Sequence, residues 1–151
     1  MSWSRKQLAG RTDGPVHAFD VPFQHVDAAG IVFFGRMFEY FHDAYVAALT
    51  QAGHPLHVAI AEKRWLAPLV HAEADYVSPL RFGDRVHAQV VAAEATESKL
   101  TVGYRVAVDG GDGAGRVAAV GHTVHVFCDM TTLKRAPMPE GIRAFFAAIG
   151  S

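Results

Sequence analysis

The chain has 151 residues, of which 50% are hydrophobic and 19% are charged, and 14 basic residues face 15 acidic ones. This length suits one domain, which buries roughly 68–70% of the surface of its unfolded chain and needs no disulfide. The near-neutral charge excludes a strong whole-chain attraction to nucleic acid or anionic membranes, and the single cysteine, Cys128, excludes a multi-cysteine zinc or iron–sulfur site.

The first residues of the chain are not expected to form a signal peptide. Residues 1–14 are polar and small, without the apolar stretch of a signal peptide, and we expect them to form a flexible leader. No apolar run approaches the ~20 residues that span a bilayer. We therefore expect a cytoplasmic protein with no membrane segment, whose residues 15–151 form a single domain.

A strand and a long helix are predicted next. Apolar residues alternate from residue 16 to 23, with Phe19, Val21 and Phe23 on one face of a strand. From about residue 36 to 52 the apolar spacing lengthens to three and four, which predicts a helix. Gly53 is placed to end this helix, and Pro55 prevents its continuation. Because the helix is apolar and aromatic over much of its surface, we expect it to be buried.

The rest of the chain is mostly strand. Strands are predicted over residues 67–79, 85–95, 100–109 and 116–129, with a glycine-rich turn over 109–115 and a short helix over 140–149. One apolar helix and one antiparallel sheet satisfy each other if the sheet wraps the helix, which predicts an α+β fold. Alanine and valine lie on both faces of these strands, which indicates a second covered face or a continued sheet, and hence a homo-oligomer.

The loop before the long helix contains the most informative polar residue. Asp27 lies between Val26 and Ala28, just before Gly30 and the apolar residues 31–34. A carboxylate there can act as a general base or nucleophile, and unpaired N–H groups at the start of the next helix can hold an oxyanion. Spacing alone favours the simpler interpretation, in which Asp27 stabilises the turn.

Residues 21–56 closely resemble the active-site segment of the 4-hydroxybenzoyl-CoA thioesterase family, the hotdog-fold acyl-CoA thioesterases. The matching pattern is D-x-A-G-I-V and two aromatic residues at 27–34, followed by an aromatic-rich helix containing Asp43. Weaker similarity covers most of residues 16–129. The resemblance implies a hotdog fold, with a sheet wrapped around a central helix, active sites at a dimer interface and often a dimer-of-dimers tetramer.

The resemblance also implies roles for particular residues. Its catalytic aspartate falls on Asp27, and the backbone N–H of Phe34, with that of Gly35 nearby, would polarise the thioester carbonyl. No metal or prosthetic group is implied, so we expect no cofactor, and coenzyme A enters only as part of the substrate. The chain departs from the family at His25, Phe34 and Gly35-Arg36, where relatives often carry an acid, a tyrosine, and Asn or His.

Six residues are candidates for substrate binding: His25, Gly30, Phe33, Arg36, Arg64 and Lys99. His25 could face the cleft of Asp27, and Phe33 could face a flat acyl group. Arg36 could meet a carboxylate or phosphate, and Arg64 and Lys99 could contact the phosphates of coenzyme A.

The nine histidines do not predict a metal site. His122 and His125 lie three apart on a predicted strand, so their side chains point to opposite faces. His54 and His57 could converge, but two histidines make a weak site.

We therefore expect an acyl-CoA thioesterase that releases a free acid and CoA, with an aromatic acyl group, such as hydroxybenzoyl, as the first choice. Asp27 would act as base for water or as a nucleophile that forms a mixed anhydride, and the sequence does not choose between them. The alternatives are a short or medium aliphatic acyl-CoA, an acyl carrier protein substrate, and a non-catalytic acyl-CoA-binding module.

Overall fold

The computed structural model describes residues 3–110 and 115–151. Its five-stranded antiparallel sheet has the order β1-β3-β4-β5-β2. The strands are β1 (Val16–Asp20), β2 (Leu69–Tyr76), β3 (Arg85–Ala95), β4 (Lys99–Val108) and β5 (Arg116–Val126). The helices are α1 (Arg5–Ala9), α2 (Arg36–Gln51), α3 (Leu56–Ala61) and α4 (Glu140–Ile149), with a 3-10 helix at Phe23–His25. This confirms the predicted α+β arrangement, although residues 111–114 of the glycine-rich turn lie outside the described residues.

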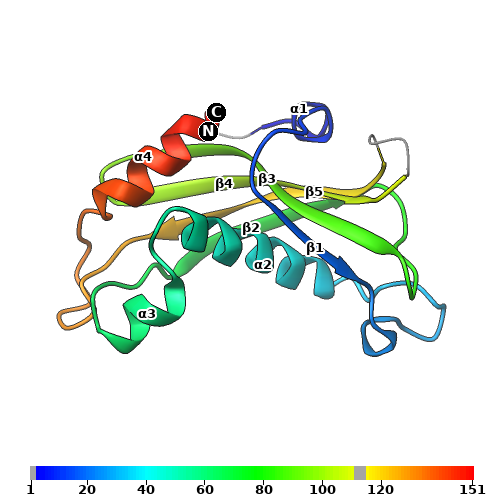
Figure 1. Cartoon of the computed structure of the whole chain (residues 1–151), viewed down its shortest axis with the longest axis horizontal. Coiled ribbons are helices and arrows are strands. Elements are labelled where there is room, and N and C mark those ends of the chain that lie inside the picture. Colours follow the sequence, from blue (N-terminus) through cyan, green and yellow to red (C-terminus); the bar gives the residue numbers. More distant parts are fainter. Residues whose placement is uncertain (1–2, 111–114) are drawn as a thin grey trace.

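Helix α2 lies along one face of the curved sheet, and α1 lies over the other face (Figure 1). The side chains that α2 buries recur at spacings of three and four, as the sequence predicts: Met37, Tyr40, Phe41, Ala44, Tyr45, Ala48 and Leu49. The apolar spacing that predicts the helix therefore corresponds to the face that the helix buries. No helix in the described part of the chain is both long and apolar enough to cross a membrane.

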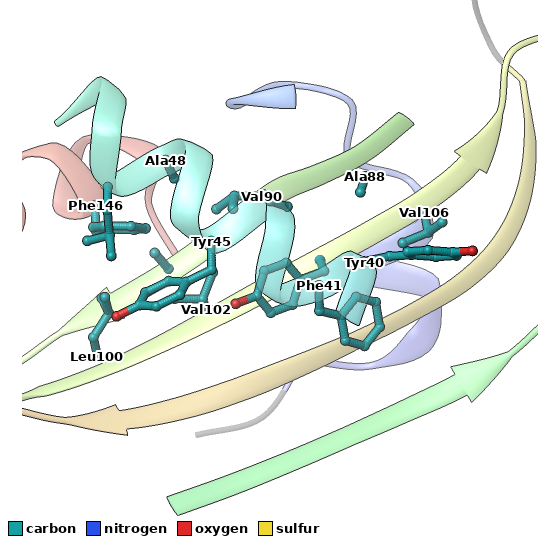
Figure 2. Close-up of a cluster of buried hydrophobic side chains, with 14 of the residues drawn as sticks. Tyr40, Phe41, Tyr45, Ala48, Ala88, Val90, Leu100, Val102, Val106 and Phe146 are labelled. Atoms are coloured by element: carbon teal, nitrogen blue, oxygen red, sulfur yellow. The ribbon is translucent and has the colours of Figure 1, made fainter. Parts of the chain in front are cut away.

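Aromatic rings of α2 pack directly on the sheet (Figure 2). The rings of Phe41 and Tyr104 of β4 are stacked, with centroids 4.8 Å apart and planes 8° apart. On the neighbouring strand, a Cβ atom at Gly121 would approach the Phe41 ring to 2.6 Å. Glycine at this position therefore lets α2 lie close to the backbone of β5, which fixes the helix over the sheet.

The first residues of the chain differ from the predicted flexible leader. Helix α1 begins with a capping box formed by Ser4 and Gln7. Trp3 and Leu8 are buried against the sheet face that α2 does not cover. A Cβ atom at Gly103 would approach Leu8 to 2.8 Å, so the absence of a side chain there makes room for α1. The chain thus covers part of its own second face, and alanine and valine on that face do not by themselves require another copy.

Candidate active site

The loop that carries Asp27 is held in place by backbone hydrogen bonds. The N–H of Asp27 donates to the carbonyl of Ile31 at 2.9 Å, and the N–H of Gly30 donates to the carbonyl of Asp27 at 3.0 Å. Gly30 has φ +79°, a conformation that favours glycine. The N–H of Val32 donates to the carbonyl of Leu80 at 2.8 Å, which ties the loop to the segment after β2. Asp27 therefore occupies a defined position although its side chain is exposed.

One carboxylate oxygen of Asp27 stabilises the turn and the other does not. Oδ1 accepts the N–H of Ala29 at 2.8 Å. Within residues 3–110 and 115–151, no group donates to Oδ2 and no cation pairs with this carboxylate. The turn interpretation from the sequence is therefore correct for Oδ1, and Oδ2 remains available for chemistry.

The backbone at the start of α2 has unused hydrogen-bond donors. The N–H of Arg36 donates to the carbonyl of Phe33 at 2.9 Å, and that of Met37 donates to the carbonyl of Phe34 at 3.2 Å. No described residue accepts a hydrogen bond from the N–H of Phe34 or of Gly35, and Gly35, the N-cap, provides no capping side chain. Because the N-terminus of a helix carries partial positive charge, these two donors can stabilise an oxyanion.

A groove of about 500 Å³ contains two of the three predicted catalytic residues, Asp27 and Phe34, and the third, Gly35, follows Phe34 in the chain. It is lined by Asp27, Ile31, Val32, Phe33, Phe34, Met37 and Tyr76 to Leu80. The rings of Phe33 and Phe34 are 49% and 63% exposed, and their centroids are 4.6 Å apart. The groove therefore has an apolar aromatic wall next to the carboxylate of Asp27.

Tyr76, at the end of β2, contacts the backbone between Phe34 and Gly35. This tyrosine was not among the site residues predicted from the sequence. Its hydroxyl donates to the carbonyl of Phe34 at 2.5 Å. Burial raises the pKa of Tyr76 above its usual value, so the hydroxyl keeps its proton at neutral pH. The carbonyl of Phe34 and the N–H of Gly35 belong to one planar peptide unit. Tyr76 therefore holds the plane in which the Gly35 N–H points. The available signal was the weaker family similarity over residues 16–129, a range that includes this tyrosine.

Three other predicted residues lie near the groove without lining it. The Nδ1 atom of His25 is 2.8 Å from the hydroxyl of Tyr40, so this ring turns toward α2 and the core. Gly30 serves the turn described above, with nothing within 4 Å of a Cβ placed there. Arg36 donates to both carboxylate oxygens of Glu39, at 3.1 and 3.0 Å.

Arg64 and Lys99 lie far from the groove within one chain. Lys99 is the first residue of β4, and Val108 is its last. Val108 pairs with Val86, which follows the turn whose Arg81 bridges to Ile31 of the Asp27 loop, so the Val108 end of β4 is the end near the groove. A ten-residue strand spans roughly 33 Å. Arg64 forms an ion pair with Glu62 and precedes Leu66, which bridges to Cys128 at the same far end of the sheet. The structure therefore does not bring these two cations to Asp27 of the same chain.

A second cavity of about 140 Å³ separates α2 from the sheet near β2. The rings of Tyr45 and His125 stack there with centroids 4.1 Å apart. The Nε2 atom of His125 is 3.0 Å from the hydroxyl oxygen of Thr123, and Nδ1 is 3.3 Å from the carbonyl of Ala67. Burial lowers the pKa of His125 to about 4, so the ring is neutral at pH 7.

Comparison with known proteins identifies the family. Residues 21–146 match the model of the thioesterase-like superfamily. The 1,4-dihydroxy-2-naphthoyl-CoA hydrolase of Synechococcus elongatus is 30% identical over 124 residues, which cover 82% of this chain and 88% of the relative. The corresponding hydrolase of Thermosynechococcus vestitus is 30% identical over 125 residues, 83% of each chain.

Solved structures agree with this assignment. A gentisyl-coenzyme A thioesterase superimposes with a TM-score of 0.75 and 30% identity, covering 85% of this chain and 98% of that one. A 1,4-dihydroxy-2-naphthoyl-CoA thioesterase from Synechocystis gives a TM-score of 0.79 at 24% identity, covering 87% and 94%, and supports the fold. The chain therefore belongs to the thioesterase-like superfamily, as its resemblance implied, and is a thioester hydrolase with the hotdog fold.

Proposed function

We propose that this protein hydrolyses an acyl-CoA with an aromatic acyl group, and that Asp27 is its catalytic carboxylate. The observation that carries the proposal is the groove that Asp27 shares with Phe33 and Phe34, beside the unused N–H groups that precede α2. A carboxylate oxygen without a partner can act as base or nucleophile, and adjacent N–H donors can stabilise the oxyanion that forms during acyl transfer.

The chemistry follows from these groups. The thioester carbonyl oxygen accepts hydrogen bonds from the N–H groups of Phe34 and Gly35, which makes the carbonyl carbon more electrophilic. In one route Oδ2 of Asp27 removes a proton from water, the resulting hydroxide attacks the carbonyl carbon, and the C–S bond breaks. The proton then passes to the leaving thiolate of CoA. In the other route Oδ2 attacks directly, CoA leaves, and water hydrolyses the mixed anhydride.

The aromatic acyl group is supported by the wall of the groove and by the relatives. The exposed rings of Phe33 and Phe34 offer flat apolar surface on which an aromatic ring can stack. The similar proteins are named for 1,4-dihydroxy-2-naphthoyl-CoA and gentisyl-CoA, both with aromatic acyl groups. An aliphatic acyl-CoA would gain less from such a wall.

A thiol-release assay tests both parts of the proposal. Wild type should turn over benzoyl-, hydroxybenzoyl- and 1,4-dihydroxy-2-naphthoyl-CoA faster than butyryl- or octanoyl-CoA. Asp27→Asn keeps an oxygen that can accept the Ala29 N–H but loses the base, so turnover should fall by about 100-fold or more. Asp13→Asn, at an exposed residue outside both the groove and β2, is the matched control. Near-wild-type turnover by Asp27→Asn would refute the assignment.

The assembly that we propose is a pair of copies joined at β2. This strand is an edge of the sheet, and four large apolar residues of the strand and its end are 45–59% exposed: Leu69, Val70, Tyr76 and Val77. An exposed apolar edge favours pairing with another strand, and two identical strands pair antiparallel about a twofold axis. That pairing would place the Leu69 end of one copy, with its Arg64, beside the groove of the other.

Light scattering tests this assembly. Wild type should have the mass of a dimer or of a multiple of it, and Val70→Lys should shift the population toward monomer and reduce thiol release together. A monomeric wild type with full turnover would contradict the pairing.

A further inference from the structure

Three potential metal ligands meet on the sheet face opposite α2. His71 and Glu73 are two residues apart on β2, so they share a face. The register places Glu73 directly opposite His122 of β5. The distance from Glu73 Oε1 to His122 Nδ1 is 3.0 Å, and that from Glu73 Oε2 to His71 Nε2 is 3.6 Å. One ligand atom from each residue lies within 4.8 Å of the other two.

One of the three side chains is held in place and the other two can rotate, an arrangement that lets the mobile ligands adjust to a bound metal ion. His122 is 7% exposed, and the Trp3 ring packs edge-on against it with centroids 6.3 Å apart and planes at 81°. The side chains of His71 and Glu73 are about half exposed. Ligand atoms around a tetrahedral Zn²⁺ lie about 3.4 Å apart, given metal–ligand bonds near 2.1 Å. Rotation of the two exposed side chains toward the fixed imidazole would supply that spacing.

We propose that His71, Glu73 and His122 form a binding site for a divalent transition metal ion, with Zn²⁺ as its reference ligand. Two imidazoles and a carboxylate are a donor set that Zn²⁺ takes in proteins, with a fourth position left for water. The sequence predicts no metal site here, because the spacing of histidines along the chain does not reveal that Glu73 of β2 lies opposite His122 of β5. Its conclusion that His122 and His125 point to opposite faces is confirmed by their contacts with Trp3 and Tyr45.

The metal site is separate from the proposed active site. Tyr76 and Ala72 lie on the side of β2 that faces α2, where they contact Phe34 and line the smaller cavity. His71 and Glu73 occupy the alternate positions and so project from the other face. The bound ion would therefore link β2 to β5 and would stabilise an edge strand of the sheet, without contacting the thioester.

Calorimetric titration of the metal-free full chain with ZnCl₂ tests this proposal. Wild type should bind one Zn²⁺ per chain with a dissociation constant in the micromolar range or tighter, and its melting temperature should rise with Zn²⁺. Glu73→Gln and His122→Gln should each weaken binding at least tenfold. His57→Gln, at an exposed histidine outside the cluster, should bind as wild type does.

Two results would overturn the site. One is the absence of stoichiometric binding by wild type, which would leave a plain His–Glu ion pair. The other is an equal affinity for Zn²⁺ in wild type, in Glu73→Gln and in His71→Gln. Both substituted side chains are about half exposed, and circular dichroism can check that the two variants fold. Asp27→Asn should retain full Zn²⁺ affinity, so the outcome is independent of the proposed function.

Discussion

The two ends of α2 differ in how they treat the backbone groups that have no hydrogen-bond partner within the helix. At the C-terminal end, the N–H groups of Ala52, Gly53 and His54 donate to the carbonyls of Ala48, Thr50 and Leu49, at 2.9 to 3.0 Å. Leu49, near this end, is fully buried in the hydrophobic core. At the N-terminal end, the N–H groups of Phe34 and Gly35 find no acceptor in the described part of the chain, and an exposed carboxylate and two exposed rings lie beside them.

This difference suggests that the C-terminal end of α2 contributes to stability, whereas its N-terminal end contributes to the reaction. Helix ends leave backbone groups without intrahelical partners, and a protein gains stability when it satisfies them. The C-terminal end does so with its own chain. The N-terminal end leaves donors to solvent, and therefore to a substrate that displaces the solvent. We expect substitutions at one end to change unfolding and substitutions at the other end to change turnover.

Leu49→Ala should have the largest effect on stability. Removing a fully buried leucine side chain leaves a cavity, and the free energy of unfolding should fall by about 3–5 kcal/mol. Urea denaturation measures this loss, and thiol release per folded molecule should remain at the wild-type level. A loss below about 1 kcal/mol, or a fall in turnover of the folded fraction, would break the proposed separation.

Acidification should destabilise the C-terminal half of the helix through His125. Burial lowers the pKa of its ring from 6.5, the value expected in the unfolded chain, to about 4 in the folded protein. The unfolded state therefore binds more protons between these values, and stability falls as the pH is lowered from 6.5 to 4, by at most about 3 kcal/mol. His125→Gln, which does not titrate, should reduce this pH dependence. Parallel curves for the two proteins would show that another group is responsible.

Tyr76→Phe should act at the open end. Loss of the hydrogen bond to the Phe34 carbonyl frees the peptide unit that carries the Gly35 N–H, so kcat should fall about tenfold with little change in KM. The free energy of unfolding should change by about 1 kcal/mol or less, because the Tyr76 side chain is only partly buried. An unchanged kcat would remove Tyr76 from the site.

Gly53→Ala should have the smallest effect. Gly53 has φ +85°, with nothing within 4 Å of an added Cβ, so the cost is conformational alone and amounts to about 1 kcal/mol. Gly10→Ala, at the C-cap of α1 with φ −83°, is the control and should be nearly neutral. Thermal unfolding compares the two, and equal shifts would contradict the role given to the φ angle.

Local pattern was sufficient to predict α2, the four strands β2 to β5 and the loop around Asp27, because periodicity and turn chemistry are encoded by neighbouring residues. The first strand was predicted to extend to Phe23, but β1 ends at Asp20, and Phe23 begins a 3-10 helix with its side chain exposed. The interactions missed were of longer range. The Tyr76 hydroxyl bonds to a carbonyl 42 residues earlier in the chain, and the proposed metal ligands Glu73 and His122 come from two strands. The sequence contains the capping box at Ser4 and Gln7, but burial of Trp3 depends on where β4 and β5 lie. Helix α3 went unpredicted because its six residues are too few to display a period.

The backbone origin of the proposed oxyanion donors has an evolutionary consequence. A main-chain N–H survives any replacement of the Phe34 side chain except proline, so the ring that lines the groove can be exchanged while the donor persists. Selection can thus retune which acyl group is admitted at the same residue that supports the reaction. Proteins descended from such an ancestor could come to accept different acyl groups while the catalytic mechanism stays the same.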